Sequence, residues 1–273
     1  MKNEFTQDTK AYLRTTENIN GYYDLFYLKN KKILTVIGSS DQIFEAVLRG
    51  ASEVDGFDIS KNAILFYYLK EAAIKTLNNE DYINFIYVEN MNYTKEKYET
   101  IRDNLNKKVL EFWDKIFSHE NYDIQRIIND MYIAPQYYMH SGLAEKRLSL
   151  LSAYIKKAYY IQLQRKINEV KINIVQRDIF DIPKTNKQYD YINFSNIFEY
   201  HDPQKFKKLI EEYKKYLTDN GIIIAGYAYH DADISEYEEY DKTKIPSRFM
   251  TMQFHGAPYD NILTTGKAKK LVK

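Results

Sequence analysis

The sequence contains no cysteine in its 273 residues. This absence excludes disulfide bonds, thiolate nucleophiles and cysteine-based metal sites. No two of the five histidines stand at metal-ligand spacing such as H-x-x-x-H, so we predict no metal site. The P-loop pattern G-x-x-x-x-G-K-[ST] is also missing, which excludes a P-loop nucleotide site. No G-x-S-x-G elbow occurs, and Ser195 has no indicated base, so a hydrolase triad has little support.

The chain has almost no net charge and no long apolar run. Lys and Arg number 39 against 38 Asp and Glu, so the bulk charge does not indicate a nucleic-acid surface. No stretch approaches the 18 apolar residues of a membrane span, and the opening MKNEFTQDTK lacks the apolar core of a signal peptide. We therefore expect a cytoplasmic protein, and its 44% hydrophobic content is enough for a full core.

Residues 31–60 predict a strand, a tight polar turn, an amphipathic helix and a second strand. Residues 33–37 form a short apolar run typical of a buried parallel strand. The turn that follows is Gly38-Ser39-Ser40, and the second strand ends at Asp58. Small residues in the turn let a ligand approach the backbone, and an acid about 20 residues beyond the glycine suits a ribose diol. The stretch therefore predicts a nucleoside-binding βαβ unit.

The turn also narrows the choice of nucleoside. The dinucleotide fingerprint G-x-G-x-x-G is incomplete, because only Gly38 is present. Asp41, beside the helix N-terminus, would repel a pyrophosphate but could face a positive charge. S-adenosylmethionine has no phosphate and carries a sulfonium and an amine, so we predict it as the cofactor. The predicted cofactor-binding residues of this unit are Gly38, Ser39, Ser40, Asp41, Asp58 and Ile59.

Several motifs in the sequence resemble those of a known protein family. TVIGSSDQIFEAVLRGASEVDGFDIS is similar to the first two motifs of class I S-adenosylmethionine-dependent transferases. LKEAAIKTL followed by EDYINF, and later SNIFEY after YDYINF, resemble the aminocarboxypropyltransferases of betaine-lipid synthesis. The resemblance covers roughly residues 33–85 and 172–226. It implies a Rossmann-like class I methyltransferase fold and transfer of a 3-amino-3-carboxypropyl group to a small-molecule or lipid acceptor.

Alternation of strands and helices predicts an α/β, doubly wound, mostly parallel seven-stranded sheet. We expect a helical N-terminal segment at residues 1–30 and the cofactor-binding domain at residues 31–88 and 166–273. Residues 89–165 then form a helical insertion between the second and third strands. In transferases of this fold the N-terminal segment often lies across the cofactor, so Thr16, Asn18 and Tyr22 could reach its methionine end.

The insertion is the unusual part of the chain. Apolar residues recur every three or four positions from Tyr98 to Ile116, which predicts one amphipathic helix. Insertions at the carboxyl edge of such a sheet usually cover the acceptor pocket. We therefore expect the aromatic loop 131–142, which carries His140, to face the acceptor.

The third and fourth strands are predicted at residues 172–175 and 189–194. In class I transferases an acid after the third strand bonds the adenine amine, and by resemblance this is Asp178, with Asp181 as a close competitor. Ile179 or Phe180 would pack on the ring.

Residues 195–201, Ser-Asn-Ile-Phe-Glu-Tyr-His, leave the fourth strand where chemistry is expected. Ser195 and Asn196 are predicted to contact the cofactor, and Asn196 and Tyr200 to position the reacting groups. Glu199 or His201 would take the proton. These two lie two positions apart, so only one faces the pocket if the segment is extended.

Beyond this segment, Pro203 begins a helix that Asn220-Gly221 stops, and residues 222–227 form the fifth strand. Residues 231–245 are expected to form a loop over the site, and residues 248–254 a late antiparallel strand. Three functions stay open: aminocarboxypropyl transfer, methyl transfer, and S-adenosylmethionine binding without catalysis. The products 5′-methylthioadenosine and S-adenosylhomocysteine would separate the first two.

Overall fold

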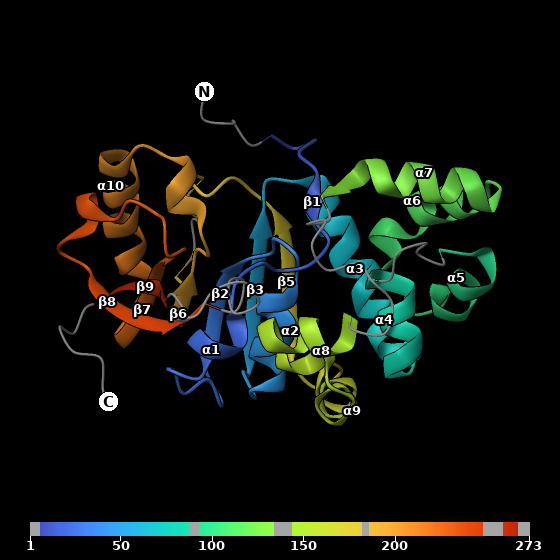
Figure 1. Ribbon diagram of the computed structural model, residues 1–273, viewed down its shortest axis with the longest axis horizontal. Coiled ribbons are helices and arrows are strands. Elements are labelled where there is room, and N and C mark those ends of the chain that lie inside the picture. Colours follow the sequence, from blue (N-terminus) through green and yellow to red (C-terminus); the bar gives the residue numbers. More distant parts are fainter. Residues whose placement is uncertain (1–5, 88–92, 134–143, 182–185, 248–258, 267–273) are drawn as a thin grey trace.

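The computed structural model describes residues 6–87, 93–133, 144–181, 186–247 and 259–266. Among these residues, seven strands form one sheet in the order β5-β3-β2-β6-β7-β9-β8, and only β9 runs against the others (Figure 1). The strands are β2 (Lys32–Val36), β3 (Glu53–Asp58), β5 (Lys171–Gln176), β6 (Tyr189–Asn193), β7 (Leu217–Ala228), β8 (Asp241–Pro246) and β9 (Tyr259–Gly266). This confirms the predicted α/β, Rossmann-like class I fold.

The chain order creates a switch point between β2 and β6. From β2 the sheet grows through β3 to β5, and the chain then returns to place β6 on the opposite side of β2. Ile33 of β2 is paired with Val54 of β3 and with Tyr191 of β6. In open parallel sheets, ligands bind outside the carboxyl ends of the strands at such a point.

The helices cover the two faces of the sheet unequally. Ile33 and Leu34 alternate along β2 and enter two different hydrophobic clusters, one on each face. The first cluster takes in α1, α2, α3 and the insertion, whereas the second is built around α10. These and the other helices are α1 (Ile19–Tyr23), α2 (Asp41–Leu48), α3 (Lys61–Thr76), α4 (Asn79–Tyr87), α5 (Lys95–Arg102), α6 (Lys107–Phe117), α7 (Asn121–Met131), α8 (Ala144–Leu151), α9 (Lys157–Lys166) and α10 (Pro203–Tyr213).

The insertion lies between β3 and β5, as predicted, and Figure 1 shows α4 to α7 gathered beside α3 at the end of the molecule opposite α10. The single helix expected over residues 98–116 is wrong, because the chain forms α5 and α6 with a break at residues 103–106. Asn106 starts α6 by accepting a hydrogen bond from the Lys108 N–H at 3.0 Å. Arg102 Nε donates to Asp114 Oδ1 at 2.7 Å and fixes the two helices side by side.

Among residues 6–30 the chain is helical only over the five residues of α1, so most of the described part of this segment is not the helix that was predicted. Before α1, the two-residue strand β1 (Ala11–Tyr12) pairs in parallel with β4 (Tyr132–Ile133) of the insertion. Between β1 and α1, two backbone N–H groups bond to distant side chains: Thr15 N–H donates to Asp41 at 2.6 Å, and Asn18 N–H donates to Tyr227 Oη at 3.1 Å. Polar contacts that local periodicity does not reveal therefore decide this conformation.

The C-terminal third differs from the prediction at three places. α10 ends at Tyr213 instead of at Asn220-Gly221, because a 3-10 turn, η4 (Lys214–Tyr216), leads into β7 at the buried Leu217. The expected loop at residues 231–245 contains a short 3-10 helix, η5 (Ser235–Tyr237), and most of β8. β8 is an edge strand in which only Ile245 is buried, so it carries no apolar alternation. The antiparallel strand is β9, and the predicted strand at 248–254 lies outside the described residues.

Candidate functional site

A cavity of about 540 Å³ opens at the carboxyl ends of β2, β3, β5 and β6. It brings together most of the residues that the sequence predicted for the site. These are Gly38, Ser39, Asp58, Ile59, Asp178, Ile179, Ser195, Asn196, Glu199, Tyr200 and His201. A volume in this range is typical of small-molecule sites. The cavity at the switch point is therefore the candidate site.

The turn after β2 is bound directly to the end of β3. Gly38 has φ +51°, a conformation that favours glycine, and its N–H donates to Asp58 Oδ2 at 2.9 Å. Ser60 N–H donates to Asp58 Oδ1, also at 2.9 Å. Burial raises the pKa of Asp58 to about 6, although the backbone N–H donors oppose the shift. A carboxylate has about four lone-pair sites, so Asp58 keeps acceptor capacity for a ligand in the cavity.

Ser40 and Asp41, which the sequence also predicted at the cofactor, do not line the cavity. Ser40 has φ +72° and is fully buried at the start of α2. Asp41 is 2% exposed, and its carboxylate accepts from Thr15 N–H at 2.6 Å and from Ser39 Oγ at 2.7 Å. Tyr154 Oη donates to the same carboxylate at 2.5 Å. Asp41 thus joins the N-terminal segment and the insertion to the turn.

A buried lysine stabilises the turn through hydrogen bonds to backbone carbonyl oxygens. Lys70 of α3 is 0% exposed, and its Nζ donates to Ser39 O at 2.6 Å and to Leu13 O at 2.5 Å. Burial lowers the pKa of Lys70 to about 8, and the charge of Asp41 partly offsets that shift. The positive charge expected near Asp41 is thus a side chain of the protein itself.

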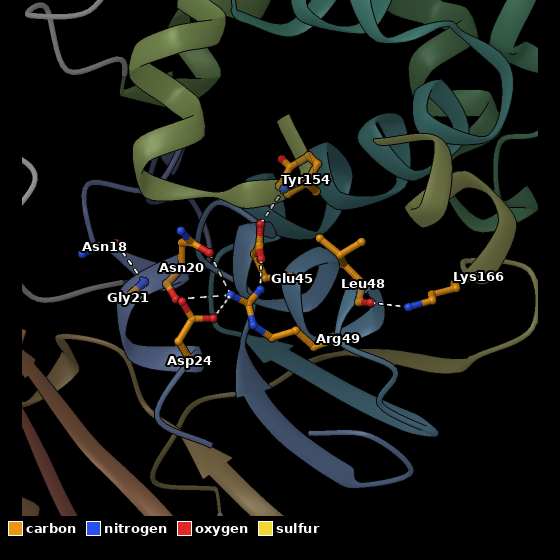
Figure 2. Close-up of polar contacts among 9 residues, drawn as sticks. All are labelled: Asn18, Asn20, Gly21, Asp24, Glu45, Leu48, Arg49, Tyr154 and Lys166. Atoms are coloured by element: carbon orange, nitrogen blue, oxygen red, sulfur yellow. Dashed lines mark hydrogen bonds and ion pairs between the residues drawn. The ribbon is translucent and has the colours of Figure 1, made fainter. Parts of the chain in front are cut away.

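The helix that follows the turn is held from two sides (Figure 2). Arg49, next to the C-terminus of α2, donates to Asn20 Oδ1 and to Asp24 Oδ1, both at 2.8 Å. It also pairs with the buried Glu45, whose other oxygen accepts from Tyr154 N–H at 2.8 Å. The N-terminal segment and the insertion therefore fix α2, and with it the position of the turn.

The structure separates the two acids that were candidates for an adenine amine. Asp178 lines the cavity, and its Oδ1 accepts from Phe180 N–H at 2.9 Å, which leaves its other oxygen available as far as the described residues are concerned. Asp181 is exposed and does not line the cavity. Phe180 lines the cavity as well, with its ring centroid 5.0 Å from that of His201. The geometry at this end of the cavity favours Asp178.

The segment after β6 turns sharply into a 3-10 helix, η3 (Ile197–Tyr200). Ser195 adopts φ +56°, and its N–H donates to Asn193 Oδ1 at 2.9 Å. Only one of Glu199 and His201 was expected to face the pocket if the segment were extended; the segment is not extended, and both residues line the cavity. Burial raises the pKa of Glu199 to about 7, and the charge of Asp231 adds to the shift.

The N-terminal segment contributes residues that sequence reasoning missed. Arg14 and Glu17 line the cavity and are 2% and 3% exposed. Glu17 accepts hydrogen bonds from Ser195 Oγ and, at 3.3 Å, from Tyr22 Oη. Burial raises the pKa of Glu17 to about 7. The only signal in the sequence is an opposite charge pair three residues apart, which is also common on exposed helices.

Of the three N-terminal residues expected at the cofactor, only Thr16 lines the cavity. Its Oγ1 lies 2.6 Å from Tyr229 Oη, another lining residue that the sequence did not indicate. Asn18 instead caps α1, and Tyr22 is buried behind Glu17. No insertion residue within 93–133 or 144–165 lines the cavity, and His140 lies outside the described residues.

Two further features of the described part of the chain bear on function. Its helices include none that is long and apolar enough to cross a membrane. Within the same residues, no group of three or more histidine, aspartate or glutamate side chains is placed to hold a metal ion.

No protein-family model matches the chain, and no curated protein matches it in sequence. Among solved structures, it is similar to the rRNA methyltransferase AviRa from Streptomyces viridochromogenes (TM-score 0.41, 9% identity, 86% of this chain and 76% of that one). It is also similar to an rRNA methylase from Streptococcus thermophilus (TM-score 0.39, 7% identity, 94% and 99%). A third is a TehB-like S-adenosylmethionine-dependent methyltransferase from Corynebacterium glutamicum (TM-score 0.36, 9% identity, 88% and 82%). None of the three supports the aminocarboxypropyltransferase family in particular.

Proposed function

We propose that the protein is an S-adenosylmethionine-dependent transferase. The observation that carries the proposal is the turn at Gly38, bound to the Asp58 carboxylate beside a cavity at the switch point of the sheet. A carboxylate with free lone pairs at the end of the second strand suits the two hydroxyls of a ribose. Asp178, with Ile179 beside it, suits an adenine amine and ring. The absence of a phosphate-binding glycine pattern favours a nucleoside without phosphate.

The N-terminal segment suits the amino acid end of this cofactor. An α-amino acid carries one carboxylate and one ammonium group, so its site needs a cation and an anion. Arg14 and Glu17 supply these charges, because both line the cavity and both are buried. Charge-assisted hydrogen bonds in a buried site are the stronger kind. We therefore assign Arg14 to the cofactor carboxylate and Glu17 to its amine.

S-adenosylmethionine supplies a carbon already activated by its bond to a positively charged sulfur. The residues of the chain must therefore mainly hold the acceptor in line and remove its proton. Asn196 Nδ2 lies 3.5 Å from Tyr200 Oη, and this pair is assigned to positioning. Glu199 or His201 is assigned to the proton. The pKa of Glu199, raised to about 7, suits a base that works near neutral pH.

The group transferred is proposed to be methyl. If Arg14 and Glu17 hold the amino acid end, the methyl group is the substituent on sulfur left free to meet an acceptor. Transfer of the 3-amino-3-carboxypropyl group remains a second candidate, supported by the resemblance of residues 33–85 and 172–226 to that family. In that case the carbon that joins the aminocarboxypropyl group to the sulfur, and not the methyl carbon, would have to face the acceptor.

Two measurements test the proposal. Calorimetry should detect binding of S-adenosylmethionine to the purified protein, and the absence of binding would contradict the proposed function. Chromatography of the nucleoside product after incubation with acceptors separates the candidates: S-adenosylhomocysteine indicates methyl transfer and 5′-methylthioadenosine indicates aminocarboxypropyl transfer. Binding without either product for every acceptor tried would support a binding protein that is not an enzyme.

A further inference from the structure

A second cavity, of about 370 Å³, adjoins the first at the end of β6. Glu199, His201 and Tyr229 line both cavities, so they form the boundary between them. The second cavity therefore lies next to the place where the proposed reaction would occur. A cavity of this volume is at the lower end of the range for small-molecule sites.

The walls of this second cavity combine acids and aromatic rings. Its acids are Glu199, Asp231 and Asp233, and its aromatic residues are Phe198, Tyr229 and Tyr237. No lysine or arginine lines it among the residues that the structure describes. Lys207, whose Nζ is 5.7 Å from the Tyr237 ring centroid, does not line the cavity and is paired with Glu239 at 3.2 Å. A ligand in this cavity thus meets net negative charge and aromatic faces.

Two polar atoms in these walls have no hydrogen-bond partner within the described residues. Glu199 Oε1 is buried and accepts no hydrogen bond from these residues. Tyr237 Oη is also buried and has no hydrogen-bond partner among them, and Tyr237 is only 2% exposed. A buried polar atom without a partner costs about 1–3 kcal/mol, so such atoms call for an explanation. A ligand that donates hydrogen bonds would satisfy Glu199, and the Tyr237 hydroxyl can pair with the same ligand.

We propose that this second cavity binds the acceptor and that the acceptor is an amine, positively charged when it arrives. The inference rests on the proposed function, because it assigns the substrate class of that site. A carboxylate attracts an ammonium group, and aromatic faces attract the same cation. A phosphate-bearing acceptor would instead meet carboxylates of its own charge. An ammonium nitrogen has no lone pair, and transfer of one N–H proton to the Glu199 carboxylate restores it.

Calorimetry with three small probes on the cofactor-free protein tests the site. We expect benzylamine to bind, benzyl alcohol to bind about tenfold more weakly because it lacks the charge, and phenyl phosphate not to bind. Equal binding of the alcohol and the amine, or no binding of the amine, would overturn the proposal. Because no cofactor is added, this outcome is independent of whether S-adenosylmethionine binds, which is measured separately.

A pair of tyrosine variants locates the binding. Tyr237→Phe removes the buried, unpartnered hydroxyl of a residue that lines the cavity, so it should weaken benzylamine binding about two- to tenfold and leave the melting temperature unchanged. Tyr240→Phe is the matched control. Its hydroxyl is also buried without a partner, and its ring centroid is 5.7 Å from that of Tyr237, but Tyr240 does not line the cavity. Equal effects of the two variants would show that the amine binds elsewhere.

An aspartate pair tests the role of charge. Asp231→Asn removes one carboxylate at the exposed rim and should weaken benzylamine binding about two- to fivefold, the size expected for an exposed charge pair. The same change at the exposed Asp219, near the start of β7, should leave the affinity for benzylamine unaltered. An unchanged affinity in Asp231→Asn would contradict the electrostatic part of the proposal.

Discussion

Ser195 Oγ donates a hydrogen bond to Glu17 Oε1, although the two residues are 178 positions apart in the chain. The bond joins the N-terminal segment to the end of β6, where the strained Ser195 begins the turn into η3. This bond fixes Glu17 at the wall of the cavity at the switch point, where its side chain is buried. The N-terminal segment is consequently part of the site and not only a cover for the sheet.

The raised pKa of Glu17 makes stability depend on pH. Between its ordinary value of 4.5 and its folded value of about 7, the folded protein binds more protons at this group than the unfolded chain does. The free energy of unfolding therefore falls as pH rises through this window. Glu17→Gln keeps an oxygen for Ser195 and cannot ionise. We expect the free energy of unfolding of the variant to exceed that of wild type by up to about 3 kcal/mol at pH 8 and to equal it at pH 4.

Urea unfolding at several pH values measures this difference. The control is Glu169→Gln, an exposed residue in a turn, which should track wild type at every pH. A constant difference between Glu17→Gln and wild type would show that Glu17 does not titrate as described. If Glu17 also holds the cofactor amine, the same variant binds S-adenosylmethionine more weakly while being more stable, a combination that a purely structural residue would not give.

Asp58→Ala should weaken S-adenosylmethionine binding by about 2–4 kcal/mol, because the carboxylate would accept charge-assisted hydrogen bonds from the ribose. The loss also removes the partner of Gly38 and Ser60, so the melting temperature should fall. Asp55→Ala separates these effects. Asp55 lies on the same strand and accepts from Tyr189 Oη at 2.6 Å, but it does not line the cavity. Calorimetry should therefore find its affinity unchanged, and a similar loss in both variants would remove the ribose assignment.

Asp178→Ala and Asp181→Ala form a second matched pair. Only Asp178 lines the cavity, so only its loss should weaken cofactor binding, by about 1–3 kcal/mol for one hydrogen bond to a charged group. Binding of S-adenosylhomocysteine can be measured in the same way and does not depend on turnover. The opposite pattern would mean that Asp181 is the adenine-binding acid.

Asn196→Ala and Tyr200→Ala test the positioning of the reacting groups. Turnover should fall about 100-fold or more once an acceptor is known, since misplacement by ~1 Å has that effect. The melting temperature should stay near wild type, because both side chains are only half-buried. A parallel loss of stability and activity would identify the two residues as structural.

Asp41→Asn should destabilise the protein by about 2–4 kcal/mol, because one carboxylate receives donors from the N-terminal segment, the turn and the insertion. An asparagine amide would direct its own N–H groups at some of these donors. Urea unfolding measures the loss, and Asp219→Asn, at an exposed position, should change stability by less than about 0.5 kcal/mol. A small effect at Asp41 would show that the network contributes little.

Local sequence was sufficient for the parts of this protein that depend on short-range pattern. The apolar run at residues 33–37, the turn at Gly38 and the acid at Asp58 predict the nucleoside-binding unit, because strand, turn and helix are each encoded within a few residues. The parallel order of the sheet follows from the alternation of strands and helices. Residues 195–201 were predicted from their place just after a strand, whereas Asp178 was assigned by resemblance to class I transferases, with Asp181 as a close competitor.

Tertiary structure alone decided the rest, because those features depend on pairs of residues far apart in the chain. Asp41 follows the turn as a ligand-contacting acid would, yet Thr15 and Tyr154 occupy its carboxylate, so it does not reach the cavity. Glu17 has no local pattern that marks it, and it becomes part of the site only because Ser195 binds it. Burial then sets the charge of Glu17, and burial is a property of the packed fold that no segment of sequence contains.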